Sequence, residues 1–212
     1  MSPLLIFAAG GHAKVVCDIA LLRGWDVAAF VTPAPAGGEF FGRPILGEAA
    51  VLAGPPGNAA IALGDCALRA ALCEKLLAAG WKLPTLVHPS AVIAADAALG
   101  EGAVVAAGAI LNPGVVVGRG CIVNTAAAID HDCRLADFVH LCPGARLAGG
   151  VEVGEGAWIG IGATIVQNVR VGRRVTLGAG AVLLNDLPDG VVAYGVPAKV
   201  RRPRDAAEAG EP

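Results

Sequence analysis

The most regular feature of the sequence is a six-residue repeat of aliphatic residues that runs from Val87 to Leu183. Every sixth residue over this stretch is Ile, Leu or Val, without an exception in seventeen positions. A second series lies two residues earlier in each repeat, from Ala91 to Ala181, and its members are all Ala, Val or Cys. Because residues i and i−2 of a strand point to the same side, one small and one aliphatic side chain face inward together in every repeat. A fixed period of this kind is the signature of a repeat architecture.

The positions between the two series are rich in Gly, Asn, Asp and Pro, which are the residues that turn a chain. Short strands joined by tight turns predict a parallel β-solenoid, in which three six-residue faces make one coil of about 18 residues. The seventeen repeats therefore predict between five and six coils. A stack of antiparallel hairpins is the alternative, but no hairpin rule requires an unbroken period of six.

The first part of the chain has a different pattern of hydrophobic and polar residues, in which apolar strand-like segments alternate with helix-like segments. We expect strands at 4–8, 26–31, 58–63 and 82–87, helices at 13–23 and 66–79, and a Pro/Gly-rich loop at 33–42. This alternation favours a small Rossmann-like parallel α/β sheet. The predicted domains are therefore 1–86, the solenoid at 87–187 and a C-terminal extension at 188–212, whose segment 191–202 leads away and whose last residues, from Pro203, fray.

Composition and charge narrow the functional classes. Hydrophobic residues make up 55% of the chain, yet no uninterrupted apolar run reaches the roughly 18 residues of a membrane-spanning helix. The N-terminal segment lacks a basic region, so a signal peptide is not expected. A net charge of −2 without a basic block argues against nucleic acid as a partner. The six cysteines form no Cys-x-x-Cys pair, which favours reduced thiols in a cytoplasmic protein.

One candidate binding site lies at the turn Gly10-Gly11-His12, between the first strand and the first helix. Ligands of parallel α/β sheets sit at the carboxyl ends of the strands, and the N–H groups of a helix start favour an anion such as phosphate. The segment does not match Gly-x-Gly-x-x-Gly, so an ordinary strand–helix turn remains an alternative on the residues alone.

Two histidines of the solenoid are candidates for chemistry. His131 lies in the turn of its repeat between Asp130 and Asp132, and neighbouring carboxylates raise the basicity of an imidazole, which suits a general base. A solvated surface histidine is the alternative. His140 alternates with inward residues and therefore points outward. Nine residues separate the two histidines, half of one coil, so they lie on opposite sides of one prism. A site that uses both requires neighbouring subunits, which predicts a homotrimer with sites in the clefts between prisms.

Several segments carry a family resemblance. The repeats Val153–Trp158, Ile159–Thr164 and Leu177–Val182 resemble the hexapeptide repeat of the left-handed β-helix acyltransferases, and the left hand of the coil is implied by this resemblance only. Further segments are similar to one branch, the bacterial nucleotide-amino-sugar N-acetyltransferases and the related sialic acid O-acetyltransferases. These segments are Asn124–Cys133, Phe138–Gly144, Leu147–Val151, Gly10–Val16, Ala62–Asp65 with Arg69, and Gly195–Lys199.

The resemblance implies an N-acetyltransferase that uses acetyl-CoA, needs no metal, and acetylates the amine of a nucleotide-linked 4-amino-4,6-dideoxy sugar for glycan biosynthesis. The alternative is O-acetylation of sialic acid or a related sugar hydroxyl. The implied catalytic residues are His131 as general base, Asp132 and Asn124. Those implied for acetyl-CoA are His140, Gly149 with its N–H as oxyanion donor, Ile161, Ala179, Gly195, Pro197 and Lys199. Those implied for the nucleotide sugar are Gly10, Gly11, His12, Thr32, Gly64 and Asp65.

Two departures from the family pattern bear on the nucleotide. Family members usually carry glycine where Ala8 stands and acidic residues where Thr32 and Pro33 stand, so the sequence leaves uracil and guanine both open.

Two other functional classes are also open. A zinc lyase of the carbonic anhydrase type needs three imidazoles on one ion, for which His88, His131 and His140 are candidates. A catalytically silent scaffold would bind no acetyl-CoA.

Overall fold

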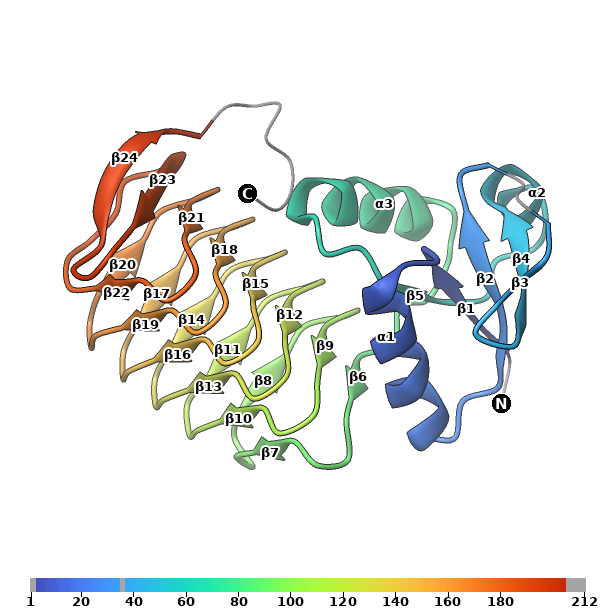
Figure 1. Cartoon of the computed structure of the whole chain (residues 1–212). Helices are drawn as coiled ribbons and strands as arrows, with labels where there is room; N and C mark the ends of the chain where they lie inside the picture. Colours follow the sequence, from blue (N-terminus) through green and yellow to red (C-terminus); the bar gives the residue numbers. More distant parts are fainter. Residues whose placement is uncertain (1–2, 35–36, 205–212) are drawn as a thin grey trace.

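The computed structural model describes residues 3–34 and 37–204 and consists of two parts (Figure 1). An N-terminal α/β domain sits at one end of a long three-sided prism of stacked coils, and an antiparallel hairpin lies at the other end. The prism confirms the predicted parallel β-solenoid, and its axis sets the direction along which the repeats stack. None of the helices within the described residues has the length and apolar character that crossing a bilayer requires.

The α/β domain contains a five-stranded sheet in the order β3-β4-β2-β1-β5. Its elements are β1 (Leu4–Phe7), α1 (Gly11–Leu22), β2 (Val27–Thr32), β3 (Glu39–Phe40), β4 (Arg43–Gly47), α2 (Glu48–Leu52), β5 (Asn58–Ile61) and α3 (Cys66–Ala78). Strand β1 pairs in parallel with both β2 and β5. The chain therefore moves to one side of β1 and later to the other, which creates a topological switch point at the carboxyl end of β1.

Two expectations for this domain were wrong in detail. The segment 33–42 is not entirely loop, because Glu39–Phe40 forms β3 and pairs antiparallel with β4, and Phe40 packs edge-on against the Phe30 ring at 4.9 Å. The segment 82–87 is not one strand. Lys82 makes a single bridge to Asn58, whereas Leu86–Val87 (β6) already pairs with the solenoid. Pro84, which has no N–H to give to a ladder, lies between the two.

The solenoid is built from two-residue strands that form three parallel sheets. The first, sheet β7–β22, contains β7 (Val92–Ile93), β10 (Ile110–Leu111), β13 (Ala128–Ile129), β16 (Arg146–Leu147), β19 (Thr164–Ile165) and β22 (Val182–Leu183). The second, sheet β8–β20, contains β8 (Ala98–Leu99), β11 (Val116–Val117), β14 (Arg134–Leu135), β17 (Glu152–Val153) and β20 (Arg170–Val171). The third, sheet β6–β24, contains β6, β9 (Val104–Val105), β12 (Ile122–Val123), β15 (His140–Leu141), β18 (Trp158–Ile159), β21 (Thr176–Leu177), β23 (Val191–Tyr194) and β24 (Lys199–Pro203).

Both series of the repeat face the interior, as predicted. The aliphatic residues from Val105 to Leu183 and the small residues from Ala103 to Ala181 are buried in one continuous core. Partners in neighbouring coils are offset by 18 residues, as Ile110 and Leu111 pair with Ala128 and Ile129. Small residues are also required where coils stack at the corners, since a Cβ on Gly154 would lie 2.6 Å from the Arg173 nitrogen.

The C-terminal segment differs from the expectation that it leads away. Strand β23 adds in parallel to β21, and β24 returns antiparallel to β23, so both extend sheet β6–β24 (Figure 1). This hairpin closes the end of the prism, and the exposed edge of the last coil is thereby paired. The expected frayed segment falls mainly on residues 205–212, which lie outside the described residues.

The joint between the two parts depends on a fully buried arginine. Arg69 of α3 is 1% exposed, and its guanidinium donates to the carbonyls of Gly120 at 2.7 Å and Phe138 at 2.7 Å in the solenoid. It also donates to the carbonyls of Leu63 and Gly64 at the end of β5. The outer face of β6 and β9 packs against β1 and α1 in a shared apolar cluster. The two parts therefore hold a fixed relative position.

We expect Arg69→Met to destabilise the protein by about 3 kcal/mol or more, because it leaves several buried carbonyls without a donor. Urea denaturation followed by circular dichroism measures this change in the free energy of unfolding. Arg134→Met, on the exposed outer face of β14, is the matched control and should change it by less than about 0.5 kcal/mol. Equal effects of the two substitutions would contradict the role given to Arg69.

Candidate functional site

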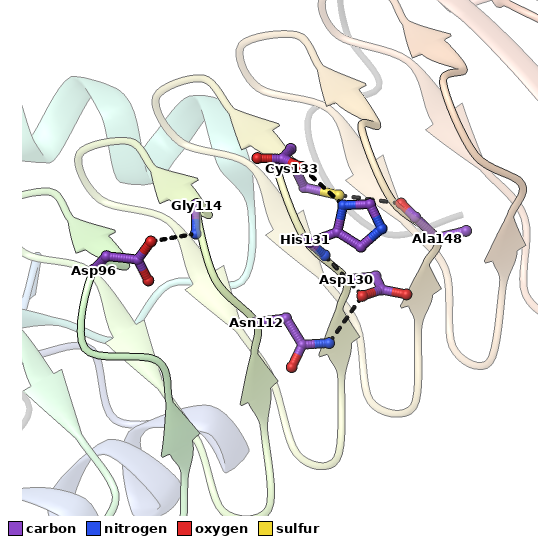
Figure 2. A network of polar contacts seen from close by, with 8 residues as sticks. Asp96, Asn112, Gly114, Asp130, His131, Cys133 and Ala148 are labelled. Carbon is purple, nitrogen blue, oxygen red and sulfur yellow. Dashed lines mark hydrogen bonds and ion pairs between the residues drawn. The ribbon is translucent and has the colours of Figure 1, made fainter.

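The turn between β13 and β14 carries the predicted base. The His131 side chain is 62% exposed, and its Nδ1 lies 2.8 Å from Asp132 Oδ2. Asp132 adopts a left-handed conformation with φ of 61°, which bends the chain directly after the histidine and is tolerated by Asp. The Asp130 carboxylate accepts from the His131 backbone N–H at 2.8 Å and from Asn112 Nδ2 at 3.0 Å (Figure 2).

These carboxylates set the charge state of the turn. The hydrogen bond to Asp132 raises the pKa of His131, and the charge of Asp130 adds to the increase. The backbone N–H of His131 and the Asn112 amide lower the pKa of Asp130, which keeps that side chain ionised. With Nδ1–H donated to Asp132, the Nε2 atom of neutral His131 has a free lone pair and can accept a proton.

Gly149 lies one coil beyond His131 at the same corner. A Cβ at Gly149 would lie 2.6 Å from both Cε1 and Nε2 of His131, so only glycine leaves room for the imidazole in this position. The Gly149 carbonyl accepts from the Asn168 N–H at 3.0 Å. Among the described residues, the Gly149 N–H donates to no acceptor. A backbone N–H therefore lies next to the exposed imidazole.

The second histidine has the opposite environment. His140 points out of the prism, as predicted, but the α/β domain covers it, so that it is only 4% exposed. Its Nδ1–H donates to the Gly64 carbonyl at 3.1 Å, and Asn124 Nδ2 donates to its Nε2 at 3.2 Å. Burial, with Arg69 nearby, lowers the pKa of His140 to about 3. This imidazole is neutral at pH 7 and holds the two parts of the chain together.

Two further polar rings lie close to His140. The His12 ring lies 6.3 Å from it, and the Trp158 ring lies 6.4 Å from it in an edge-on arrangement. Burial, followed by the charge of Arg69, lowers the pKa of His12 to about 4. Within the described residues, His12 Nε2 and Trp158 Nε1 are buried without a hydrogen-bond partner. Unpaired buried polar atoms are costly, and such atoms are commonly satisfied by water or a ligand.

The residues implied for the nucleotide sugar gather at the carboxyl edge of the α/β sheet. Gly10 and Gly11 begin α1 directly after β1, and a Cβ on either would meet no atom within 4 Å. Gly64 and Asp65 follow β5, the neighbouring strand. Asp65 caps α3 by accepting from the Leu68 N–H at 2.8 Å, which gives its carboxylate a structural partner. Thr32 ends β2 and donates to the Ala34 carbonyl.

One corner of the prism, between sheets β6–β24 and β7–β22, carries most of the residues implied for acetyl-CoA, namely Ile161, Ala179 and the segment Gly195–Lys199. Ile161 is 57% exposed there, and the Ile161 carbonyl accepts from the Gly180 N–H, next to the exposed Ala179. The Gly195 carbonyl accepts from the Val182 N–H, and the exposed Pro197 and Lys199 follow. This corner is not the corner of His131. Gly149 lies instead at the corner of His131, and His140 lies on the outer face of sheet β6–β24.

The structure thus separates the expected residues into two groups within one chain. His131, Asp132 and Gly149 lie together at one corner, whereas Asn124 bonds to His140 and not to His131. The sequence pattern did not single out Asn112 or Trp158. Asn112 could have been found from its 18-residue offset to Asp130, but the burial of Trp158 depends on the α/β domain. The three imidazoles required for zinc do not converge, and no group of three His, Cys, Asp or Glu side chains in the described segments could hold a metal ion.

Two family models match the chain. The model of the PglD N-terminal domain matches residues 3–76, and the model of the bacterial transferase hexapeptide (six repeats) matches residues 150–185. These matches coincide with the α/β domain and with the later coils of the solenoid.

Solved structures resemble nearly the whole chain. PerB from Caulobacter crescentus, in complex with CoA and GDP-perosamine, is 41% identical with a TM-score of 0.90, covering 94% of this chain and 97% of that chain. The acetyltransferase domain of PglB from Neisseria gonorrhoeae, in complex with acetyl coenzyme A, is also 41% identical with a TM-score of 0.88, covering 94% and 98%. The chain therefore belongs to the family of hexapeptide-repeat sugar N-acetyltransferases that carry a PglD-like N-terminal domain.

Curated relatives match over a shorter stretch. Galactoside O-acetyltransferase of Lactococcus lactis subsp. lactis (strain IL1403) is 39% identical over 59 residues, which cover 28% of this chain and 28% of that protein. The chain thus covers less than a third of the length of this curated relative, and this similarity concerns a part of the molecule only.

We expect Asp132→Asn to lower the pKa of His131 toward the ordinary value of about 6.5, because the hydrogen bond to Asp132 is the largest cause of the increase. An NMR titration of the His131 imidazole in the wild type and the variant measures the change. Asp137→Asn, which replaces the carboxylate paired with Arg119 at another corner, is the control and should leave the titration unchanged. An unchanged midpoint in Asp132→Asn would contradict the prediction.

Proposed function

We propose that the protein is an acetyl-CoA-dependent N-acetyltransferase that acetylates the amine of a nucleotide-linked 4-amino-4,6-dideoxy sugar. The observation that carries the proposal is the exposed His131 imidazole, with Nδ1 bound to Asp132 and Nε2 against Gly149. The nearly full-length relatives PerB and PglB support the substrate classes, since PerB was solved in complex with CoA and GDP-perosamine and PglB with acetyl coenzyme A. PerB structures with a histidine replaced by Asn or Ala also contain CoA and GDP-perosamine.

The geometry suits direct transfer. The sugar amine attacks the thioester carbonyl, its proton goes to His131 Nε2, and the C–S bond breaks as the CoA thiolate leaves. The Gly149 N–H, which has no acceptor within the described chain, can stabilise the oxyanion of the tetrahedral intermediate. The buried cysteines take no part: burial raises the pKa of Cys133, whose thiol donates to the Ala148 carbonyl at 3.1 Å. No acyl-enzyme is required.

All six cysteines are buried as thiols rather than joined in disulfides, in keeping with a reducing cytoplasm.

The nucleotide sugar fits the edge between β1 and β5. The open Gly10–Gly11 turn at the start of α1 offers N–H groups for the diphosphate. His12 and Trp158 add buried polar atoms that lack partners within the described chain. Thr32 stands where the family resemblance implies an acidic residue, so in this proposal a neutral group meets the nucleotide there. The assay with UDP- and GDP-linked sugars distinguishes uracil from guanine.

A homotrimer completes the site in this proposal. The corner of His131 and the corner of Ile161 border opposite edges of sheet β7–β22. The outer face of this sheet begins with Val92 and Ile110, which are 63% and 40% exposed. Three prisms that turn this face toward a common axis bring His131 of one subunit to Asn124, His140 and Ile161 of the next. The two groups of residues that lie apart in one chain then share one cleft.

We expect His131→Ala to lower kcat by about 10²–10⁴-fold with a nucleotide-linked amino sugar as acceptor, because the general base is lost. A screen of UDP- and GDP-linked amino sugars for acetyl-CoA-dependent thiol release identifies the acceptor. The corresponding sugar with a hydroxyl in place of the amine tests O-acetylation with the same enzyme preparation. His88→Ala, at the first corner of the prism, is the matched control. Activity of His131→Ala within a few-fold of the wild type would reject the general base.

We expect Ile110→Arg to convert the trimer into monomers and to abolish more than about 90% of activity, because each site then lacks the neighbouring corner. Sedimentation velocity and the thiol-release assay measure the two effects. Val116→Arg places the same charge on the outer face of β11, in the neighbouring sheet β8–β20, and should leave a trimer. A monomeric wild type with full activity would contradict the shared cleft.

A further inference from the structure

The Asp130 carboxylate connects two neighbouring coils at the turn of His131. Its Oδ1 atom accepts from the His131 backbone N–H at 2.8 Å and from Asn112 Nδ2, in the preceding coil, at 3.0 Å (Figure 2). Asp132 holds the imidazole ring, and Asp130 holds the main chain that carries it. The histidine is thus restrained at two points, and the second point depends on an amide 19 residues earlier in the sequence.

The solenoid does not need these polar residues in order to fold. Asn112 and Asp130 occupy the position that follows the inward aliphatic residue of sheet β7–β22. The other members of this column are apolar: Ala94, Ala148, Val166 and Leu184. The backbone hydrogen bonds are nevertheless the same throughout, at 2.9 Å from the Ala94 N–H, 3.0 Å from Asn112 and 3.0 Å from Ala148. Polar side chains therefore occur in this column only in the coil of His131 and the coil beneath it.

We propose that Asn112 is a positioning residue for acyl transfer, which acts through Asp130 to fix the His131 turn so that the imidazole stays against Gly149. The inference rests on the proposed role of His131 as general base. Without Asn112, the Asp130 side chain keeps one hydrogen-bond donor and can rotate away from the turn. The His131 N–H then loses its acceptor, and the ring loses its fixed distance from the Gly149 backbone. A displaced catalytic group is costly even where the shift is small.

The electrostatic consequence has a defined sign. The carboxylates that act on His131 are Asp130 and Asp132, and both raise its pKa. The Asn112 amide helps to keep Asp130 ionised and close. Loss of this amide therefore lowers the pKa of His131. Because the general base must be unprotonated, the acid limb of the pH profile of kcat/KM moves to lower pH. The maximal value of kcat/KM falls as well, since the base is displaced. A residue that merely supports the coil would change stability without moving this limb.

Four proteins test the proposal: the wild type, Asn112→Ala, Asp130→Ala and the double variant. We expect Asn112→Ala to lower kcat between about tenfold and a hundredfold with KM for acetyl-CoA within about twofold, and to shift the NMR titration of His131 to lower pH. The double variant should match Asp130→Ala in both readouts, because Asn112 acts through Asp130. Asn112→Gln, which retains an amide, should recover part of the activity.

Asp96→Ala is the matched control, since its carboxylate accepts from the Gly114 N–H at 3.1 Å in a comparable contact between coils (Figure 2). It should leave kcat and the His131 titration unchanged. Additive losses in the double variant, or an unshifted titration in Asn112→Ala, would overturn the proposal. If Asn112→Ala lowers the melting temperature, Asn112→Leu carries the same test at similar volume. A wild type that is inactive on every amino sugar would reject the proposed function. The NMR titration needs no substrate, so it still decides whether Asn112 acts on His131.

Discussion

The stacking of backbone hydrogen bonds at an interval of 18 residues is the constraint on which the molecule depends. Each two-residue strand donates and accepts within a parallel ladder, so an insertion of one residue in any coil would turn the inward series outward. This constraint explains why the aliphatic series has no exception. It also converts sequence offsets into positions in space. His131 and Gly149 meet because 18 residues separate them, and Asn112 meets Asp130 for the same reason.

The α/β domain changes the chemistry of one face of this otherwise uniform prism. Without it, His140 and Trp158 would be exposed on the outer face of sheet β6–β24, like the corresponding residues of the other two sheets. Arg69 and the apolar joint hold the domain over this face, and they bury both side chains. The carboxyl edge of the α/β sheet is thereby brought to the solenoid. In the proposed function, the edge that takes the nucleotide and the corner that takes the thioester become parts of one surface.

The sequence predicted the solenoid, the inward series and the exposed turn of His131, because all three follow from local periodicity. It did not predict the burial of His140, since outward direction is a local property whereas burial requires a distant domain. The sequence did not predict the strand Glu39–Phe40, because this strand lies in a Pro/Gly-rich segment and is held by the packing of Phe40 on Phe30. The hand of the coil has no signal in the residue pattern, and only family resemblance indicates it.

The surroundings of two histidines in the same solenoid shift their pKa values in opposite directions. Two neighbouring carboxylates raise the pKa of the exposed His131, whereas burial lowers that of His140 to about 3. A pair of titratable groups pushed apart in this way marks a division of roles. The exposed His131 holds a proton more readily than an ordinary imidazole, whereas His140 stays neutral and offers fixed hydrogen bonds. The proposed proton-transfer step therefore belongs to the corner turn, and the covered face contributes shape and polarity without taking up charge.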